Sequence, residues 1–230
     1  QATPKFSVKS KQLIFSNGTK LSYNHLINCA GLQSDRVAHK FGVGKEYIIL
    51  PFKGSYWQLK KGAPFKFDTN LYPVPDLSVP FLGVHVTPSI DSTIYLGPTA
   101  TLAMGRENYQ GLRGIEPLMS LGFLGHMATQ VITDKKMRNY VYNQAFDWTP
   151  RNFLTAVKTI VPKIEMIHIE RSSKVGIRAQ LYDKYDQKLI QDFVMLDGPS
   201  STHIVNSISP AFTASFELAD HIINNSKVFN

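Results

Sequence analysis

The chain has 230 residues, of which 43% are hydrophobic, and a formal net charge of +8. This length allows one large domain or two small ones, and the composition excludes a disordered segment. The single cysteine, Cys29, excludes an internal disulfide and a cysteine-based zinc cluster, and fits a reducing compartment. The basic residues are scattered, which favours anionic ligands or a membrane surface, and nucleic acid is not expected as a partner.

The N-terminal segment predicts a β-hairpin followed by a short buried strand. Apolar and polar side chains alternate over residues 6–10 and 11–15, and residues 16–19 (Ser-Asn-Gly-Thr) are a strong turn signal. Residues 23–30 form an apolar run that ends at Gly31. Small residues after a buried strand allow another group to approach the backbone closely.

A short helix and then a sheet are expected next. Ser34 or Asp35 can cap a helix over residues 36–41. The middle of the chain is rich in prolines and β-formers, and residues 91–93 (Asp-Ser-Thr) predict a turn. The expected strands there are residues 47–50, 55–60, 71–74, 82–87 and 93–97. Strands at this spacing without intervening helices favour an antiparallel or mixed sheet.

The C-terminal third predicts two helices around further strands, and residues 115–132 are expected to be helical in part. Thr149 can cap a helix that begins at Pro150 and ends before Pro162. The remaining strands are expected at residues 166–171, 176–181, 189–195 and 203–205, with a turn at 185–187. A last helix is expected over residues 210–223.

Several motifs, in a shared order over nearly the whole chain, carry a resemblance to a known family. They are residues 26–35, 50–56, 71–76, 80–87, 96–98, 106–109, 176–180, 192–194 and 203–215. Together they resemble the FAD-dependent oxidoreductases of the D-amino-acid-oxidase-like superfamily, especially the L-2-hydroxyglutarate dehydrogenases and oxidases. Lys53 and Ser55 stand where this family usually has Arg and Glu.

The resemblance implies an α+β fold, with a mixed or antiparallel-sheet substrate domain and the C-terminal part of a Rossmann-like FAD-binding domain. Residues 1–44 would end the FAD-binding domain, 45–165 would bind substrate, and 166–230 would close the FAD-binding domain. The Gly-x-Gly-x-x-Gly fingerprint for the cofactor's pyrophosphate is not found, because Gly42-Val-Gly44 has Tyr47 at the third glycine's place. We therefore interpret the chain as the C-terminal portion of a larger enzyme, with an N-terminal FAD-binding half as its missing partner.

Contacts to FAD are implied at two places. Asn28, Ala30 and Gly31 would approach the ribityl or pyrophosphate region. The second place is the segment that opens the last helix, where exposed N–H groups and the positive end of the helix dipole would stabilise reduced flavin. Its expected contacts are Asn206, Ser207, Ser209, Pro210, Ala211 and Thr213. A well-capped surface helix is the alternative.

Five further residues are implied to bind cofactor or substrate. Arg178 lies between apolar residues, and its guanidinium would hold the flavin or a substrate carboxylate, unless it is a paired structural cation. Gln180 follows Arg178 by two residues and therefore lies on the same face of the expected strand. Lys53, Tyr56 and Tyr72 would complete the substrate-binding set, with core or rim packing as the alternative for both tyrosines.

Two histidines compete for the role of base. His85 sits in an apolar strand, where a neutral imidazole could take a hydroxyl proton while hydride leaves for the flavin. His203 precedes the final helix segment and is the rival candidate. A satisfied core histidine is the alternative for each. No metal is expected, because no cluster of ligands at metal-binding spacing occurs.

The function expected from these residues is oxidation of L-2-hydroxyglutarate, or a similar 2-hydroxyacid, to the 2-oxoacid. A related amino-acid or amine oxidase, a glycerol-3-phosphate dehydrogenase, and a degenerate non-catalytic interaction module are the alternatives. Quinone or oxygen would reoxidise the flavin, and a peripheral membrane position, mitochondrial in a eukaryote, is left open beside a cytoplasmic one.

Overall fold

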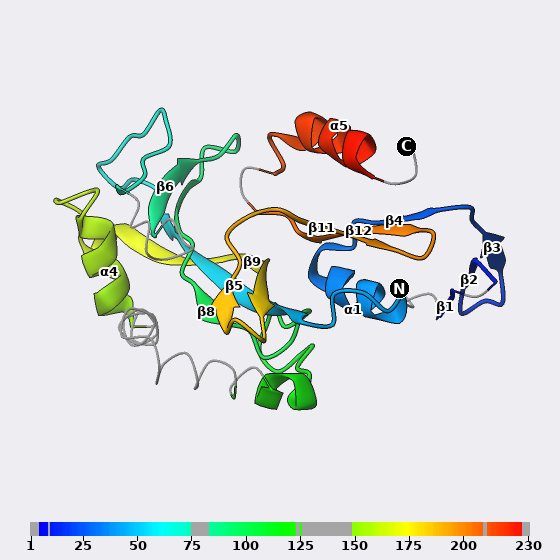
Figure 1. The fold of residues 1–230 in the computed structure, drawn as a ribbon. Coiled ribbons are helices and arrows are strands. Elements are labelled where there is room, and N and C mark those ends of the chain that lie inside the picture. The colour runs from blue at the N-terminus through cyan, green and yellow to red at the C-terminus, as the bar shows by residue number, and fades with distance from the viewer. Residues whose placement is uncertain are drawn as a thin grey trace. The chain divides into compact units, whose positions relative to one another are not determined.

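The chain divides into two compact units, Gln1–Leu50 with Ala179–Asn230, and Pro51–Arg178. The computed structural model describes residues 5–8, 10–74, 83–122, 125, 149–208 and 211–226. Two long strands, β5 (Tyr47–Leu59) and β9 (Ile169–Asp183), each begin in one unit and end in the other (Figure 1). Within the described ranges, no helix has the length and apolar character needed to cross a membrane.

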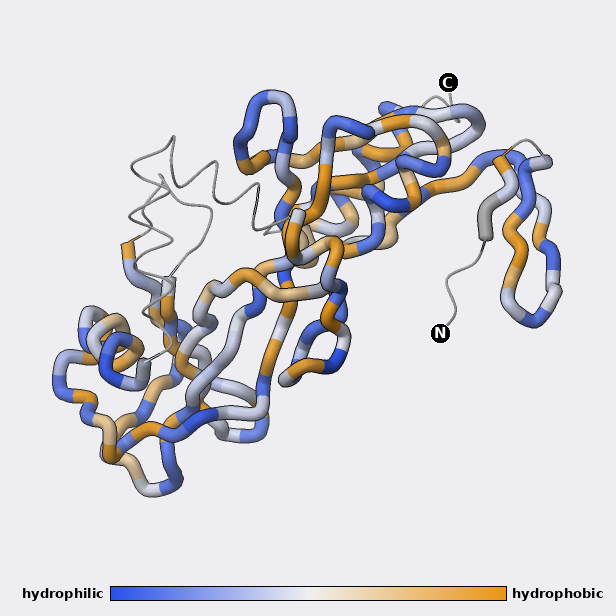
Figure 2. The backbone as a smooth tube through the Cα atoms, turned by 90° about the horizontal axis from the view of Figure 1, so that it is seen from below, coloured by the Kyte–Doolittle hydropathy of each residue, from blue (hydrophilic) through white to orange (hydrophobic). Residues whose placement is uncertain are grey.

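The first unit begins with a three-stranded antiparallel meander, β1 (Lys5–Ser7), β2 (Gln12–Ile14) and β3 (Lys20–Ser22). Hydrophobic and hydrophilic stretches alternate along this part of the chain (Figure 2). In the turn between β2 and β3, Gly18 has a φ of 84° and the Thr19 amide donates to Asn17 Oδ1 at 3.0 Å. The turn and the pairing of the first two strands were predicted, since they depend on local residue chemistry. The strands are shorter than expected, and β3 was not predicted.

A second sheet in the same unit has the order β11-β12-β4. β4 (Leu26–Asn28) is parallel to β12 (Ser201–Asn206), whereas β11 (Val194–Gly198) is antiparallel to β12. β4 is shorter than the strand that was predicted over residues 23–30. Because β4 and β12 are parallel, their carboxyl ends lie at one edge of the sheet, where ligands bind in open α/β sheets.

Helix α1 (Ser34–Lys40) follows the 3₁₀ turn η1 (Gly31–Gln33). The predicted cap was wrong, because the N-cap residue is Gln33 and it makes no side-chain cap. Ser34 Oγ instead donates to the carbonyl oxygen of Val205 at 3.4 Å, and Asp35 accepts from the amide of Ile49 at 2.9 Å. Both polar side chains therefore tie α1 to strands. The core of this unit contains Ala38, Ile49, Leu181 and Val205.

The largest sheet has the order β10-β9-β5-β7-β6, and β8 also pairs with β5. Its short strands are β6 (His85–Pro88), β7 (Ile94–Gly97), β8 (Thr101–Leu102) and β10 (Lys188–Leu189). The turn predicted at residues 91–93 is present, and the Thr93 amide donates to Asp91 Oδ1 at 3.0 Å.

Five predicted strands of this sheet differ from the structure. The strands expected at 47–50 and 55–60 are one strand, β5, and those expected at 166–171 and 176–181 are merged in β9. Residues Met166–His168 form a 3₁₀ turn, η2, ahead of β9. The strand expected at 71–74 is reduced to a single bridge between Leu71 and Val86.

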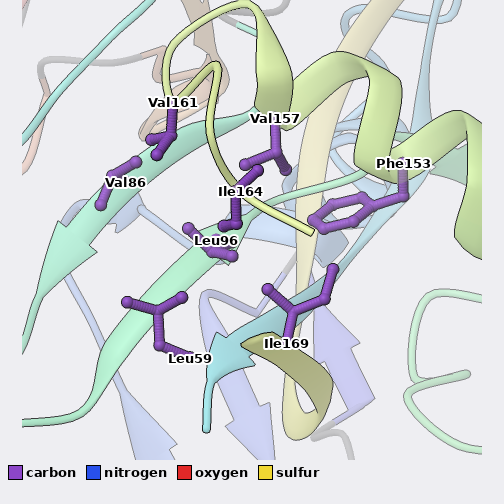
Figure 3. Close-up of a cluster of buried hydrophobic side chains, with 8 residues drawn as sticks. All are labelled: Leu59, Val86, Leu96, Phe153, Val157, Val161, Ile164 and Ile169. Atoms are coloured by element: carbon purple, nitrogen blue, oxygen red, sulfur yellow. The ribbon is translucent and has the colours of Figure 1, made fainter. Parts of the chain in front are cut away.

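Helix α4 (Pro150–Lys158) lies against one face of this sheet (Figure 1). Thr149 Oγ1 accepts from the Asn152 amide at 3.2 Å, as predicted for its N-cap. Phe153 stacks on Trp57 with ring centroids 5.2 Å apart. The buried side chains of this core converge between helix and strands (Figure 3): Leu59, Val86, Leu96, Phe153, Val157, Val161, Ile164 and Ile169.

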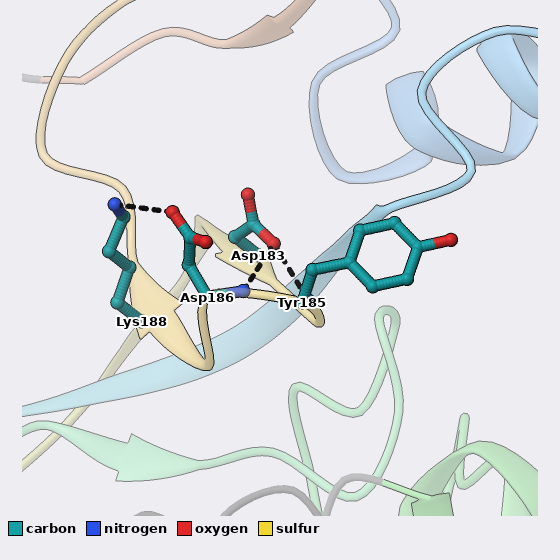
Figure 4. A network of polar contacts seen from close by, with 4 residues as sticks. All are labelled: Asp183, Tyr185, Asp186 and Lys188. Atoms are coloured by element: carbon teal, nitrogen blue, oxygen red, sulfur yellow. Dashed lines mark hydrogen bonds and ion pairs between the residues drawn. The ribbon is translucent and has the colours of Figure 1, made fainter.

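The turn between β9 and β10 is held by the Asp183 carboxylate (Figure 4). Its Oδ1 accepts from the amides of Tyr185 at 2.8 Å and Asp186 at 3.0 Å, and Lys188 pairs with Asp186 at 2.6 Å. The turn predicted at residues 185–187 is therefore confirmed.

The last helix, α5 (Ser215–Asn225), begins five residues later than predicted. Its N-cap is Ala214, which makes no side-chain hydrogen bond, and residues 211–214 form turns ahead of it. Ser207, Ala211 and Thr213 thus precede the helix, and the expectation that they form its first turn was wrong. Ser209 and Pro210 lie outside the described residues, as does half of the helix predicted at 115–132.

Candidate functional site

The strands of the unit Pro51–Arg178 present two different faces. Trp57 and Leu96 are paired in register and face the core beneath α4. The next pair, Gln58 and Tyr95, points to the other side because successive strand residues alternate. Tyr56 lies on this second face as well, and its ring meets that of Tyr95 edge-on at 6.2 Å.

A cluster of polar and aromatic side chains gathers on this second face, which we call the tyrosine face. The Lys174 ammonium lies 4.9 Å from the ring centroid of Tyr56 and 4.2 Å from that of Tyr95. The rings of Tyr72 and His85 pack together with centroids 4.8 Å apart. The tyrosine face comprises Tyr56, Tyr72, His85, Tyr95 and Lys174.

His85 has the arrangement of a neutral proton acceptor. Its Nδ1 lies 3.2 Å from the carbonyl oxygen of Gly83, and a carbonyl can only accept, so Nδ1 carries the proton. The lone pair is then on Nε2, which has no partner among the described residues. Burial lowers the pKa of His85 below 6.5, the Gly83 carbonyl opposes this, and Lys174 lowers the pKa further. The imidazole is therefore kept neutral at physiological pH.

The tyrosine hydroxyls of this face are uncommitted within the described residues. Tyr56, Tyr72 and Tyr95 make their contacts through the rings, and none of their hydroxyls donates to an acceptor in that part of the chain. Burial raises the pKa of Tyr56, and the nearby Tyr72 raises it further. Tyr56 thus keeps its proton and remains a hydrogen-bond donor.

Arg178 and Lys53 lie in the same unit at different places. Arg178 is four residues beyond Lys174 on β9, so strand alternation puts it on the tyrosine face. Lys53 is four residues before Trp57 on β5, and alternation puts it on the opposite face. There its Nζ donates to the backbone and side-chain oxygens of Asn108, both at 3.3 Å.

His203 belongs to the unit Gln1–Leu50 with Ala179–Asn230 and is fully buried on β12. Asn28 Nδ2 donates to its Nδ1 at 2.9 Å, so Nε2 carries the proton and donates to Ser201 Oγ, also at 2.9 Å. Phe41 packs edge-on against the ring at 5.0 Å. Burial, reinforced by His25 and opposed by Asp197, lowers the pKa of His203 to about 4. With both ring nitrogens bonded, the geometry favours a structural role.

The backbone after β4 is open and carries small side chains. Asn28 Nδ2 also donates to the Ser34 carbonyl at 2.8 Å, and its Oδ1 accepts from the Ala30 amide at 3.1 Å, so this side chain shapes the turn. Cys29, Ala30 and Gly31 are exposed. Gly31 has a φ of 53°, and a Cβ added there would meet no atom within 4 Å. This segment leaves room for a ligand beside the backbone.

Gln180 and Asn206, predicted for substrate and cofactor respectively, lie side by side in the same unit. Both donate to the carbonyl oxygen of Ile190, at 2.7 Å and 3.2 Å, and Asn206 also donates to the carbonyl of Asp192. Gln180 is fully buried, and its Oε1 accepts no hydrogen bond. Ser207 and Thr213, farther along, are exposed.

Two members of the tyrosine face, Tyr95 and Lys174, were not among the predicted site residues. Lys174 precedes Arg178 by four residues on the same strand, so the two share a strand face. This spacing could have identified Lys174 as a site residue. Tyr95 reaches the face only through its pairing opposite Gln58, which the sequence does not show.

Comparisons with known proteins identify the family. Residues 7–224 match the family described as FAD dependent oxidoreductase (DAO), and the chain belongs to this family. It is 31% identical over 207 residues to L-2-hydroxyglutarate dehydrogenase of Escherichia coli (strain K12), covering 90% of this chain and 48% of that protein. It is 37% identical over 205 residues to mitochondrial L-2-hydroxyglutarate dehydrogenase of Caenorhabditis elegans, covering 86% and 46%. The chain spans about half the length of these relatives.

A solved structure shows the same fold. The FAD-bound L-alpha-glycerophosphate oxidase of Mycoplasma pneumoniae superposes with a TM-score of 0.57 at 17% identity, covering 96% of this chain and 48% of that one. The α+β fold with a mixed or antiparallel sheet, expected from the sequence, is thereby confirmed.

The residues at the ends of β4 and β12 fit the family's cofactor. The exposed backbone at Ala30 and Gly31 has no bulky side chain that would keep a ligand away. Beside Asn206, the buried Oε1 of Gln180 is an acceptor without a donor, and an unpaired buried acceptor costs about 1–3 kcal/mol. FAD carries N–H and hydroxyl donors that match such an acceptor.

Proposed function

We propose that the protein of which this chain forms all or part is an FAD-dependent oxidoreductase that oxidises L-2-hydroxyglutarate, or a close 2-hydroxyacid, to the 2-oxoacid. The observation that carries the proposal is the identity of 31% and 37% to L-2-hydroxyglutarate dehydrogenases over most of the chain. The chemistry of the tyrosine face supports it independently.

Oxidation of a 2-hydroxyacid removes a hydride from the carbon and a proton from its hydroxyl. FAD, when bound, supplies the acceptor for the hydride. His85 is the base in our proposal, because its Nε2 lone pair is uncommitted among the described residues and its ring is held neutral. The proton from the hydroxyl passes to Nε2 as the carbonyl forms.

The carboxylate next to the reacting carbon requires donors close to the base. Two tyrosines are suited to this role. The ring of Tyr72 packs on His85, and Tyr56 is close enough to Tyr72 for its pKa to be raised by it. Arg178 on the same face is proposed as the guanidinium that holds cofactor or substrate. The predictions for Lys53 and Gln180 as substrate ligands are untested, and their contacts with Asn108 and Ile190 favour supporting roles.

The other unit is proposed to hold FAD. Ala30 and Gly31 would let the cofactor approach the backbone after β4, and Asn28 would fix the shape of that turn. Asn206 and Ser207 would contact it after β12. We keep Ser209, Pro210, Ala211 and Thr213 as proposed contacts through the segment ahead of α5. His203 acts in this proposal as a packing residue, since it has no ring nitrogen left for a proton.

The test has two steps. The purified chain is first titrated with FAD, and the flavin absorbance of the loaded chain is then followed after L- or D-2-hydroxyglutarate is added. We expect reduction with the L enantiomer, and we expect His85→Gln to slow it by about 10²–10⁴-fold. His221→Gln, on the exposed face of α5, is the matched control and keeps the activity. Flavin binding without reduction by any 2-hydroxyacid would refute the proposal.

The pH dependence gives a second test of the base. Only neutral His85 accepts a proton, and its pKa lies below 6.5, so activity should persist below pH 6.5 and fall at lower pH. The charged and ionisable groups around it are Lys174, Tyr72 and Tyr56. An acid limb unchanged in position by Lys174→Met would contradict this assignment, because loss of that positive charge raises the pKa of His85.

A further inference from the structure

We infer that Lys174, with the hydroxyls of Tyr56 and Tyr95, forms an anion subsite that binds the second carboxylate of a dicarboxylic 2-hydroxyacid. The inference rests on the proposed function, since it names the substrate class of that same site. The subsite would make a dicarboxylate a better substrate than a monocarboxylate of similar length.

The charge of Lys174 is not neutralised by the described residues. Its ammonium contacts two aromatic rings, at 4.9 Å and 4.2 Å, and no carboxylate in the described ranges lies within ion-pair distance. Lys188, by contrast, pairs with Asp186 at 2.6 Å. Contacts with two ring faces position the ammonium but satisfy none of its donors with an oxygen acceptor, so N–H remains available for one.

The neighbouring tyrosine hydroxyls also favour an anionic ligand. The Lys174 ammonium lies over the rings of both Tyr56 and Tyr95, and the hydroxyls of these tyrosines donate to no acceptor among the described residues. The edge-on contact between the two rings, at 6.2 Å, fixes both in place before a ligand arrives. An ammonium with fixed hydroxyl donors beside it is suited to a carboxylate.

The subsite lies on the same face as the proposed base. Tyr56 touches Lys174 with its ring and lies near Tyr72, which packs on His85. The field of Lys174 also reaches His85. A short diacid can therefore place its reacting carbon by the histidine and its far carboxylate by the lysine. The competing explanation, a lysine that only packs on the rings, predicts an effect on stability and none on ligand choice.

The test compares glutarate with butyrate as ligands of the purified 230-residue chain by titration calorimetry. Lys174→Met keeps the aliphatic stem over the rings and removes the charge, and Lys174→Arg keeps the charge. We expect Lys174→Met to weaken glutarate binding roughly tenfold or more, as loss of a charged hydrogen bond implies, while butyrate binding changes little. Lys174→Arg should retain most of the preference. Lys188→Met, at the exposed start of β10, is the matched control and should change neither.

The kinetic arm uses the FAD-loaded chain with L-2-hydroxyglutarate and L-2-hydroxybutyrate. Lys174→Met should raise KM for the diacid about tenfold with kcat little changed, and leave KM for the monoacid unaltered. If Lys174→Met affects both substrates or neither, the subsite is refuted while the proposed function stands. If glutarate binding depends on Lys174 but no 2-hydroxyacid reduces the flavin, the proposed function fails and the dicarboxylate subsite stands.

Discussion

Replacing His203 by glutamine should remove a large part of the chain's sensitivity to acid. The imidazole is fully buried, with Asn28 donating to Nδ1 and Nε2 donating to Ser201. Protonating it would put a second N–H against the Asn28 amide and a charge into the core. Because burial is the main cause, the pKa is lowered from 6.5 to about 4, and the neutral form is the one that the fold stabilises.

The sign and size of the effect follow from linkage. His203 in the unfolded chain gains a proton near pH 6.5, whereas in the folded chain it gains one only near pH 4. Between these values the unfolded state binds more protons, so stability falls as the pH falls. The full contribution is present above pH 6.5. Integration gives a loss of about 2 kcal/mol from pH 7 to pH 5 and about 3 kcal/mol from pH 7 to pH 4.

Urea unfolding at several pH values measures this contribution. His203→Gln should be less stable than the parent at pH 7 by about 1–3 kcal/mol, since its hydrogen bonds are disturbed. Its curve should then be flatter than the parent's by about 3 kcal/mol between pH 7 and pH 4. His221→Gln, exposed on α5, should keep the parent's slope. Parallel curves for the parent and His203→Gln would refute the reasoning, because they would show that the pKa of His203 is the same in the folded and unfolded chain.

Two substitutions test the packing that supports the tyrosine face. Gly97 has a φ of 138°, and a Cβ there would lie 3.0 Å from Tyr56 Cδ1. Gly97→Ala should therefore lower the free energy of unfolding by about 1–3 kcal/mol, measured by thermal unfolding. Gly176→Ala is the control and should cost far less, because a Cβ at Gly176 would meet no atom within 4 Å. Phe153→Ala should cost about 3–5 kcal/mol in urea unfolding, because its buried ring stacks on Trp57. Phe212→Ala, 92% exposed, is its control, and equal costs for the two would contradict the core assignment.

The parts of the fold that follow from neighbouring residues were predictable. The Asn17-Gly18 turn and the Thr149-Pro150 start of α4 are such cases, since each depends on hydrogen bonds or φ values within a few residues. The continuity of β5 was not predictable. Two strands were expected, at residues 47–50 and 55–60, but the single strand is held by pairing with distant segments. The carbonyl of Pro51, for example, accepts from the amide of Ala103 at 2.8 Å.

The candidate site was predictable one residue at a time, but not as a group. His85, Tyr56 and Tyr72 stand out in the sequence as aromatic or ionisable residues on expected strands. Lys174 joins them from a strand more than 100 residues away from Tyr56, and only the order of strands in the sheet brings the two together. The start of α5 was misplaced for a related reason, because small residues and a proline also suit turns.

The hydrogen bonds of the two candidate histidines distinguish a structural residue from a proposed base. His203 donates and accepts within the protein, so a reaction at either nitrogen would first break a buried bond. His85 uses only its Nδ1, and the fold fixes that proton on a backbone carbonyl, which leaves the basic nitrogen for a ligand. The uncommitted charge of Lys174 and the uncommitted hydroxyls of Tyr56 and Tyr95 lie on the same face as this nitrogen. Polar groups that the described residues leave without partners are those that a substrate can satisfy, and for that reason we propose that the chemistry takes place on the tyrosine face.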